Sequence, residues 1–354
     1  MGNFPTSAFK PAMSRIPQTD YETATAAAAS AFVEENIKTP ERTKLEPSEV
    51  DNADYATGYD QPTDSWVEGW KTSVQWQMDL ASQNLGRYLL AVFGSVETSM
   101  LAAGVYEHIF KPLDRLTTVQ LAAYSIIEHL APAQNAVDKK IPSMVAKSLQ
   151  LASSGKAKLD GTLQWEGSGE VVEPSAVTWD THVDKIQGAL NYFFAKQSEL
   201  IRSDTDDSNA VNVKCDLKSW SFGVQNEFAE DDYGCPKFVD DDPTKGAIRS
   251  HYLLLKQMFT QAWTMKLQAN SPEHQHLIDR KELKIVNRMI GGDIDGTYNH
   301  QLDVTSFLSK YAAVDDGFED GFAVVSMSPK MLYDTTANKI VEVKLINNVA
   351  SYTA

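Results

Sequence analysis

Two histidines stand two positions apart in the segment SPEHQHLID, and imidazole pairs at short spacing can bind metals. His274 and His276 would point to opposite sides of a helix but to one side of a strand, where they could chelate. No nearby Cys or Glu completes a set at the spacing of a zinc site. A metal site and a polar surface loop both stay open here, and the sequence favours the loop.

Acidic runs are the second group of residues with ligand chemistry. They read SDTDDSN, EDDYG, VDDDP, GGDIDG and DDGFEDG. A calcium-binding EF-hand loop needs ligands at alternate positions and a glutamate at the twelfth. The run with Asp293 and Asp295 comes nearest, but its twelfth position lacks the glutamate. Calcium sites and solvated turns both stay open, and turns are favoured because Asp and Gly form them.

Motifs for other chemistry are missing from the sequence. It contains no GxxxxGK[ST] or GxGxxG phosphate loop and no GxSxG nucleophile elbow. Paired carboxylates for glycoside cleavage stay open, because only their separation in space identifies them. Trp66, Trp70 and Trp76 could line a sugar groove, but Trp at strand spacing is more typical of a core. The sequence therefore predicts no catalytic, cofactor or metal site, and no enzyme.

Composition and charge set the class of protein. The chain has 354 residues, 42% of them hydrophobic, and 48 acidic against 32 basic residues give a formal net charge of -16. Such a chain can bury a substantial core and repels nucleic acid and anionic membranes, although the charge also serves solubility. Cys215 and Cys235 are too few for a disulfide framework, so we expect free thiols, with a single bridge left open. Without a signal peptide or a long apolar run, the sequence predicts a soluble protein made in a cytosol.

The first 60 residues differ from the rest of the chain. They are poor in large apolar residues and rich in Pro, Ala, Thr, Glu and Asp, so they cannot bury a core alone. Within them, TATAAAASAFVEEN could form a short helix. The sequence predicts an extended N-terminal arm over residues 1–60 that contributes little core and contacts other subunits.

Alternating apolar and polar residues dominate residues 61–354. Residues 73–80 predict a half-buried strand, and residues 82–93 a short amphipathic helix with Ser82 as N-cap and Gly94 after its end. Two strand-like stretches flank the Pro-Leu-Asp turn at 112–114. A long hairpin follows in SMVAKSLQLASSGKAKLDGTLQWE. Its expected apolar face comprises Val145, Leu149, Leu151, Ala157, Leu159, Leu163 and Trp165.

The second half of the chain repeats these features. The alternation changes phase near Lys218, which predicts a β-bulge. RSHYLLLKQMFTQ is ambiguous between helix and strand, and its length favours a helix. Residues 262–269 and the terminal KIVEVKLINNVASYTA alternate regularly, and so predict strands. The sum is a mainly β, antiparallel sandwich or barrel with one packed helix, whose halves 61–175 and 185–354 could be a degenerate repeat.

The order of these features resembles the tail tube proteins of long-tailed bacteriophages, also called major tail proteins. The resemblance is carried by LGRYLLAVFGS, by VYEHIFKPLD with Asp114 at its turn, by the hairpin from Ser148 to Gly169, by GVQNEF, and by the terminal strand with Asn347 and Asn348. It covers residues 60–352. The acidic stretch 204–242, the segment 246–278 and the long arm depart from a minimal version.

The resemblance implies a structural virion protein. Such subunits form rings, most often of six, which stack into a hollow tube through which DNA passes into the host. A tape measure protein and a tail terminator would be its partners, and the host cytoplasm its place of assembly. An electronegative wall would let DNA slide, and we expect Asp160, Gln164 and Glu166 to face the channel. The hairpin would leave an edge that a neighbouring copy completes.

Two other interpretations stay open. One is a different virion β-sandwich, such as a terminator, decoration or adhesin protein, and the other is an acidic carbohydrate-active enzyme.

The arm supplies the first prediction. Deleting residues 1–55 should leave a folded core that no longer polymerises, because the arm joins subunits while burying little. Electron microscopy of the truncated protein tests this, and long tubes would contradict the role given to the arm.

Overall fold

The computed structural model describes residues 9–353, except 20, 22, 40, 52–64, 119, 131–136, 173–175, 186–189, 214–215, 230–236, 239–246, 250–251, 268–271 and 320. The helices are α1 (Ser82–Phe93), α2 (Trp179–His182), α3 (Glu273–Ile278) and the 3-10 turn η2 (Ala195–Gln197). The strands are β1 (Phe9–Ser14), β2 (Phe32–Glu34), β3 (Lys44–Asp51), β4 (Ser65–Asp79), β5 (Gly94–Ala102), β6 (Val105–Pro112), β7 (Tyr124–Leu130), β8 (Val137–Ser154), β9 (Asp160–Gly167), β10 (Val183–Asp184), β11 (Ser198–Ser203), β12 (Val211–Asn212), β13 (Leu217–Phe228), β14 (Lys237–Phe238), β15 (Ala247–Ile248), β16 (Leu254–Lys266), β17 (Leu283–Asp293), β18 (Asn299–Glu319), β19 (Phe322–Leu332) and β20 (Val341–Asn347). The predicted mainly β class with a packed short helix is confirmed.

Two groups of strands enclose the core. The first runs β3–β4–β9–β8–β13–β16, with every neighbouring pair antiparallel. The second runs β12–β11–β17–β18–β20–β6–β5, also antiparallel. β19 joins them, since it pairs with the end of β16 and with the second half of β18. One core cluster draws side chains from both groups, including Trp76, Trp165, Ile285 and Val343.

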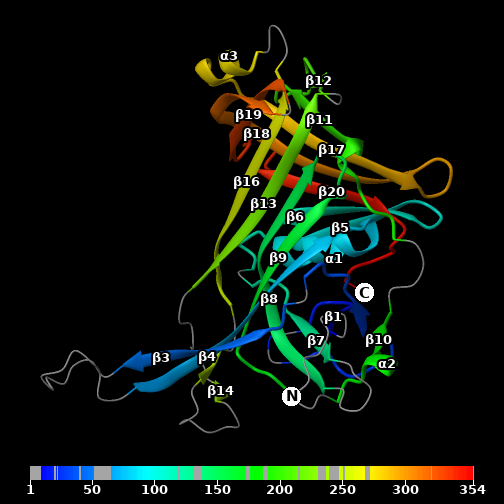
Figure 1. The fold of residues 1–354 in the computed structure, drawn as a ribbon, viewed down its shortest axis with the longest axis vertical. Helices are drawn as coiled ribbons and strands as arrows, with labels where there is room; N and C mark the ends of the chain where they lie inside the picture. The colour runs from blue at the N-terminus through cyan, green and yellow to red at the C-terminus, as the bar shows by residue number, and fades with distance from the viewer. Residues whose placement is uncertain are drawn as a thin grey trace, which may run out of the picture.

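The molecule is elongated, and its ends differ. Figure 1 places α3 and the labels of β18 and β19 toward one end of the long axis, and β3, β4 and β14 toward the other. β3 and the first part of β4 form a hairpin that projects from the body. These two ends therefore present different elements to any neighbouring molecule.

Helix α1 is confirmed with one correction at its start. Ala81, not Ser82, is the N-cap, and the Ser82 hydroxyl instead lies 2.9 Å from Nδ1 of His300. Gly94 ends the helix as predicted, with a φ of 86° that favours glycine. Gly86 leaves room for the Tyr352 ring, which a Cβ at this position would overlap. The helix is therefore clamped between the sheets and the C-terminal segment.

The long hairpin forms as β8 and β9, but its edges are not free. β8 pairs with β9 on one side and with β7 and β13 along other parts of its length, and β9 pairs with β4. The expectation that this hairpin leaves an edge for a neighbour is therefore wrong. A register shift between Ala146 and Ser148 places Val145 in a separate cluster from Leu149, so the expected apolar face is also split.

Part of the predicted arm belongs to the core. β1 pairs with β7 and β2, and Met13 and Phe32 are fully buried. Glu35 is also buried, its carboxylate 2.7 Å from the Arg87 guanidinium of α1 and bonded to the Tyr88 hydroxyl. Burial raises the pKa of Glu35 above its ordinary value, although both partners favour the carboxylate. The expectations of a helix over 23–36 and of an arm with little core are thus wrong for residues 9–37. The expectation that a chain without residues 1–55 keeps an intact core is wrong for the same reason.

Of the other predicted elements, one is wrong and two are confirmed by the structure. Residues 254–266 form strand β16 rather than the favoured helix, because they close the sheet beside β13. The bulge predicted near Lys218 is present as a register shift between Leu217 and Ser219. The terminal strand β20 pairs with β18 and β6. Strands of the two sequence halves pair with each other, β8 with β13 and β6 with β20.

The buried segment 9–37 makes a stability prediction. Phe32→Ala should lower the free energy of unfolding by about 3–5 kcal/mol, because it opens a cavity under β1 and β2. Leu45→Ala in β3, where the side chain is 46% exposed, is the matched control and should change it by less than about 0.5 kcal/mol. Denaturant titration followed by tryptophan fluorescence measures both, and equal effects would contradict the placement of Phe32.

Candidate assembly surfaces

Neutral side chains, most of them polar, occupy the middle of the outer face of the first strand group. In one cross-strand row the residues directly opposite each other are Gln75, Gln164, Ser148, Gln225 and Met258. The next row is Gln77, Thr162, Gln150, Gly223 and Thr260. The intervening rows carry the core, for example Trp76, Leu163, Leu149 and Val224. Strand alternation thus gives this sheet one apolar face and one polar face, and the two middle rows of the polar face carry no charge.

The polar rows are linked across strands. Nε2 of Gln164 donates to Oε1 of Gln75 at 2.9 Å, and the Ser148 hydroxyl donates to Oε1 of Gln164 at 3.0 Å. At the end of the sheet beyond these rows, Thr264 and Ser326 hydroxyls lie 3.0 Å apart. Hydrogen-bonded amides and hydroxyls are held in place, so the face is ordered as well as polar. We call the rows from Gln75 to Met258 and from Gln77 to Thr260 the neutral band.

Charges lie at the borders of the neutral band and are paired. Asp160 and Asp79 stand opposite each other, and Nζ of Lys38 lies 3.1 and 2.8 Å from their carboxylates. Burial opposes ionisation of Asp79, but hydrogen bonds from Lys38 and Lys158 hold its pKa below the usual value. Glu166 is paired with Lys147 at 2.8 Å. Asp160, Gln164 and Glu166 therefore share one face, but the expected run of free acidic groups is absent from the described part of it.

The edges of this sheet are unequal. On one side, the chain at 37–38 and β3 border β4. β3 is acidic and contains Pro47, features that protect an edge from pairing. On the other side, β16 pairs with β19 only over Trp263–Lys266. Among the described residues, 258–262 have a strand partner on one side alone, which leaves backbone groups for a neighbour.

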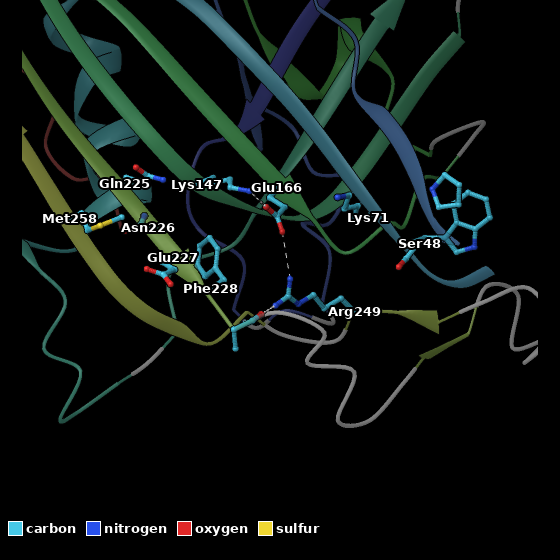
Figure 2. A pocket seen from close by; sticks show the side chains of 13 residues that line it. Ser48, Lys71, Lys147, Glu166, Gln225, Asn226, Glu227, Phe228, Arg249 and Met258 are labelled. Carbon is cyan, nitrogen blue, oxygen red and sulfur yellow. Dashed lines mark hydrogen bonds and ion pairs between the residues drawn. The ribbon is translucent and has the colours of Figure 1, made fainter. Parts of the chain in front are cut away.

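A groove opens below the neutral band, where the projecting hairpin leaves the body. It holds about 520 Å³ between β3 and β4, β8 and β9, and the ends of β13 and β16. Figure 2 shows Lys71, Lys147, Glu166 and Arg249 around it, with Phe228 on the side of β13. We call it the basic groove, because three cations line it against the carboxylates of Glu166 and Glu227.

The cations of the basic groove differ in exposure. Arg249 is 10% exposed; its guanidinium donates to the Ala229 carbonyl, lies 3.5 Å from Glu166 and stacks 4.0 Å from the Tyr252 ring centroid. Lys71 and Lys147 are 55% and 48% exposed. Arg249 therefore holds the groove wall together. The half-exposed ammonium groups of Lys71 and Lys147 are paired with Glu46 at 3.7 Å and with Glu166 at 2.8 Å. Alternation did not reveal this site, because the bulge at Lys147 and the chain reversal before Arg249 leave no periodic signal.

The predicted ligand residues do not assemble into a site. His274 lies 3.0 Å from Asp316, whereas the His276 ring lies against Tyr311. Asp293 and Asp295 accept backbone N–H bonds at 2.8–3.0 Å, which is a turn. Cys215, Cys235 and the runs EDDYG and VDDDP lie outside the described residues.

The three candidate tryptophans do not share a surface that could hold a sugar. Trp76 is buried in the core, its ring centroid 5.7 Å from that of Trp165. Trp70 lines the basic groove instead. The backbone of Trp66 lies in β4, but its side chain is outside the described part of the structure.

Comparison with protein-family models gives no match for this chain, and comparison with curated protein sequences gives none. Within the described ranges, no helix combines the length and apolar character needed to cross a membrane. In the same ranges, His, Cys, Asp and Glu side chains nowhere gather in threes at metal-binding distance.

Two buried histidines make the fold sensitive to acid. Burial lowers the pKa of His108, although the Val349 carbonyl and Asn347 oppose this, and burial lowers the pKa of His300. Both contributions to stability are complete above the ordinary pKa of about 6.5 and are lost as the pH falls from there toward the lowered folded pKa.

The free energy of unfolding should therefore decrease below pH 6.5, with up to about 1.4 kcal/mol per pH unit from each buried histidine. His300→Gln should reduce this slope, because it removes one of the two buried imidazoles. Urea titrations from pH 5 to 8 measure the slope. A slope that His300→Gln does not alter would contradict the neutral, buried state of His300.

Proposed function

We propose that this chain is the tube-forming subunit of a phage tail, a structural virion protein whose copies form stacked rings around a DNA channel. The observation that carries the proposal is the neutral band, an ordered, uncharged polar surface on the back of an apolar sheet face. This band would line the channel. The resemblance in sequence pattern and the mainly β fold support the same assignment.

A neutral polar wall suits a channel that DNA must pass without stopping. Lysine and arginine would hold phosphate groups. Free carboxylates, which the sequence led us to expect on this wall, would let DNA slide but would also repel the strand as it enters. Exposed apolar side chains would bind non-specifically to any apolar surface. Gln, Ser and Thr avoid all three, because water competes well for their hydrogen bonds. At the border of the band, Lys38 neutralises part of the negative charge of Asp79 and Asp160.

The flanks of the sheet supply the means of assembly. A strand edge with open backbone groups is a template for another chain, and closed rings remove such edges. Residues 258–262 of β16 present that edge on one flank, and the projecting hairpin of β3 and β4 reaches out on the other. Rings of this kind would meet a tape measure protein inside the tube and a terminator at its end.

Assembly itself is the first test of this proposal. Purified protein should sediment as rings or polymer as its concentration rises, and negative-stain microscopy should show hollow tubes or rings. Protein that stays monomeric at every concentration and salt condition would contradict the proposal.

The channel face is tested by chemical labelling. Gln150→Cys, in a Cys215→Ser and Cys235→Ser background, should react with both a small maleimide and a polyethylene-glycol maleimide when dispersed. In tubes it should keep its reaction with the small reagent and lose that with the large one, because only the small one diffuses along the channel. Equal reaction with the large reagent in both states would place this face on the exterior.

A further inference from the structure

The turn between β18 and β19 carries an exposed aromatic side chain among acidic ones. Phe318 is 88% exposed and Phe322 is 53% exposed. Asp316 and Glu319 are 56% and 55% exposed beside them. A phenylalanine side chain exposed to this extent would bury apolar area if a second molecule covered it. We call residues 315–319 with Phe322 the acidic tip.

Side chains of neighbouring elements hold the acidic tip in place. Lys218 lies 3.2 Å from Glu319, Lys266 sits 5.0 Å from the Phe322 ring centroid, and His274 bonds Asp316. These contacts fix the direction of the tip while leaving the Phe318 ring in solvent. An anchored side chain loses little conformational entropy on docking, which favours a role in recognition.

The basic groove offers the complementary surface at the other end of the molecule. Its walls include Trp70, Phe228, Pro47 and Met258. Its charged residues are Lys71, Lys147 and Arg249 against Glu166 and the exposed Glu227, so positive charge exceeds negative charge by one. Arg249, nine-tenths buried, keeps Nε without a hydrogen-bond partner at the wall. An aromatic ring flanked by carboxylates would meet the apolar wall of this groove and its excess of one positive charge.

We infer that the acidic tip of one copy docks into the basic groove of the next copy along the tube, with Phe318 against the aromatic wall. This rests on the proposed function and names the surfaces that join successive rings. Figure 1 places the labels of β18 and β19 toward one end of the long axis, and β3 and β4, which line the groove, toward the other. The contact would therefore be head to tail. A head-to-tail contact whose rotation does not close into a ring propagates as a filament.

The experiment uses two variants of the full chain. Phe318→Ser removes the exposed aromatic ring of the tip. Lys71→Glu with Lys147→Glu replaces two positive charges of the groove with negative ones. Each should raise the concentration needed for tube growth about tenfold or more, as loss of an interface anchor does, while rings persist. Leu116→Ser, at a leucine that is 97% exposed, and Lys185→Glu with Lys196→Glu are matched controls and should form tubes normally.

Mixing and charge exchange separate this contact from a general loss of folding. An equimolar mixture of the two variants should give paired rings but no long tubes, since each retains one intact surface. Adding Asp316→Lys and Glu319→Lys to the groove variant should restore tube growth. Thermal melting confirms that each variant is folded.

The possible results are distinct. Tubes of wild-type length from Phe318→Ser and from the groove variant would overturn the inference and leave the proposed function standing. Failure of charge exchange to restore growth would overturn the assigned pairing of tip and groove. Wild-type protein that forms no polymer would overturn both.

Discussion

The structure depends on continuous backbone pairing along β8. β9 flanks this strand on one side, and β7 and β13 pair with it along other parts of its length. Its register therefore fixes that of these three strands and, through β9 and β13, that of β4 and β16. With the register fixed, successive side chains must point to opposite faces. Leu149 and Leu151 enter the core, and Gln150 must then face outward beside Thr162. A shift of one residue would bury the glutamines and expose the leucines.

The same constraint explains how the N-terminal segment takes part. β1 pairs along the edge of β7 and β2 pairs with β1, so the N-terminal segment continues this part of the sheet. Glu35 then lies against Arg87 and Tyr88 with almost no solvent. A buried ion pair adds little net stability, but it penalises any arrangement that leaves one partner unpaired. The segment is thus fixed to α1, whereas the hairpin of β3 and β4 extends outward.

Much of this fold follows from local sequence, and the remainder depends on contacts distant along the chain. Alternation predicts β4, β9, β13 and β20, and Gly94 predicts the end of α1, because these signals are local. Residues 254–266 form a strand because β13 offers a partner, which no window of sequence reveals. Likewise, Phe32 and Glu35 sit in a stretch of low hydrophobicity, and their burial depends on β7 and α1. The basic groove joins residues from Pro47 to Met258, and only the folded chain brings them together.

The central claim is that the uncharged face of the sheet formed by β4, β9, β8, β13 and β16 surrounds a channel. A helical reconstruction of the assembled protein by electron cryomicroscopy tests it most directly. The account predicts that Gln75, Gln150 and Gln225 line a continuous lumen while Trp76 and Leu149 stay in the wall. A solid filament, or a tube whose lumen is formed by β5 and β6, would contradict it.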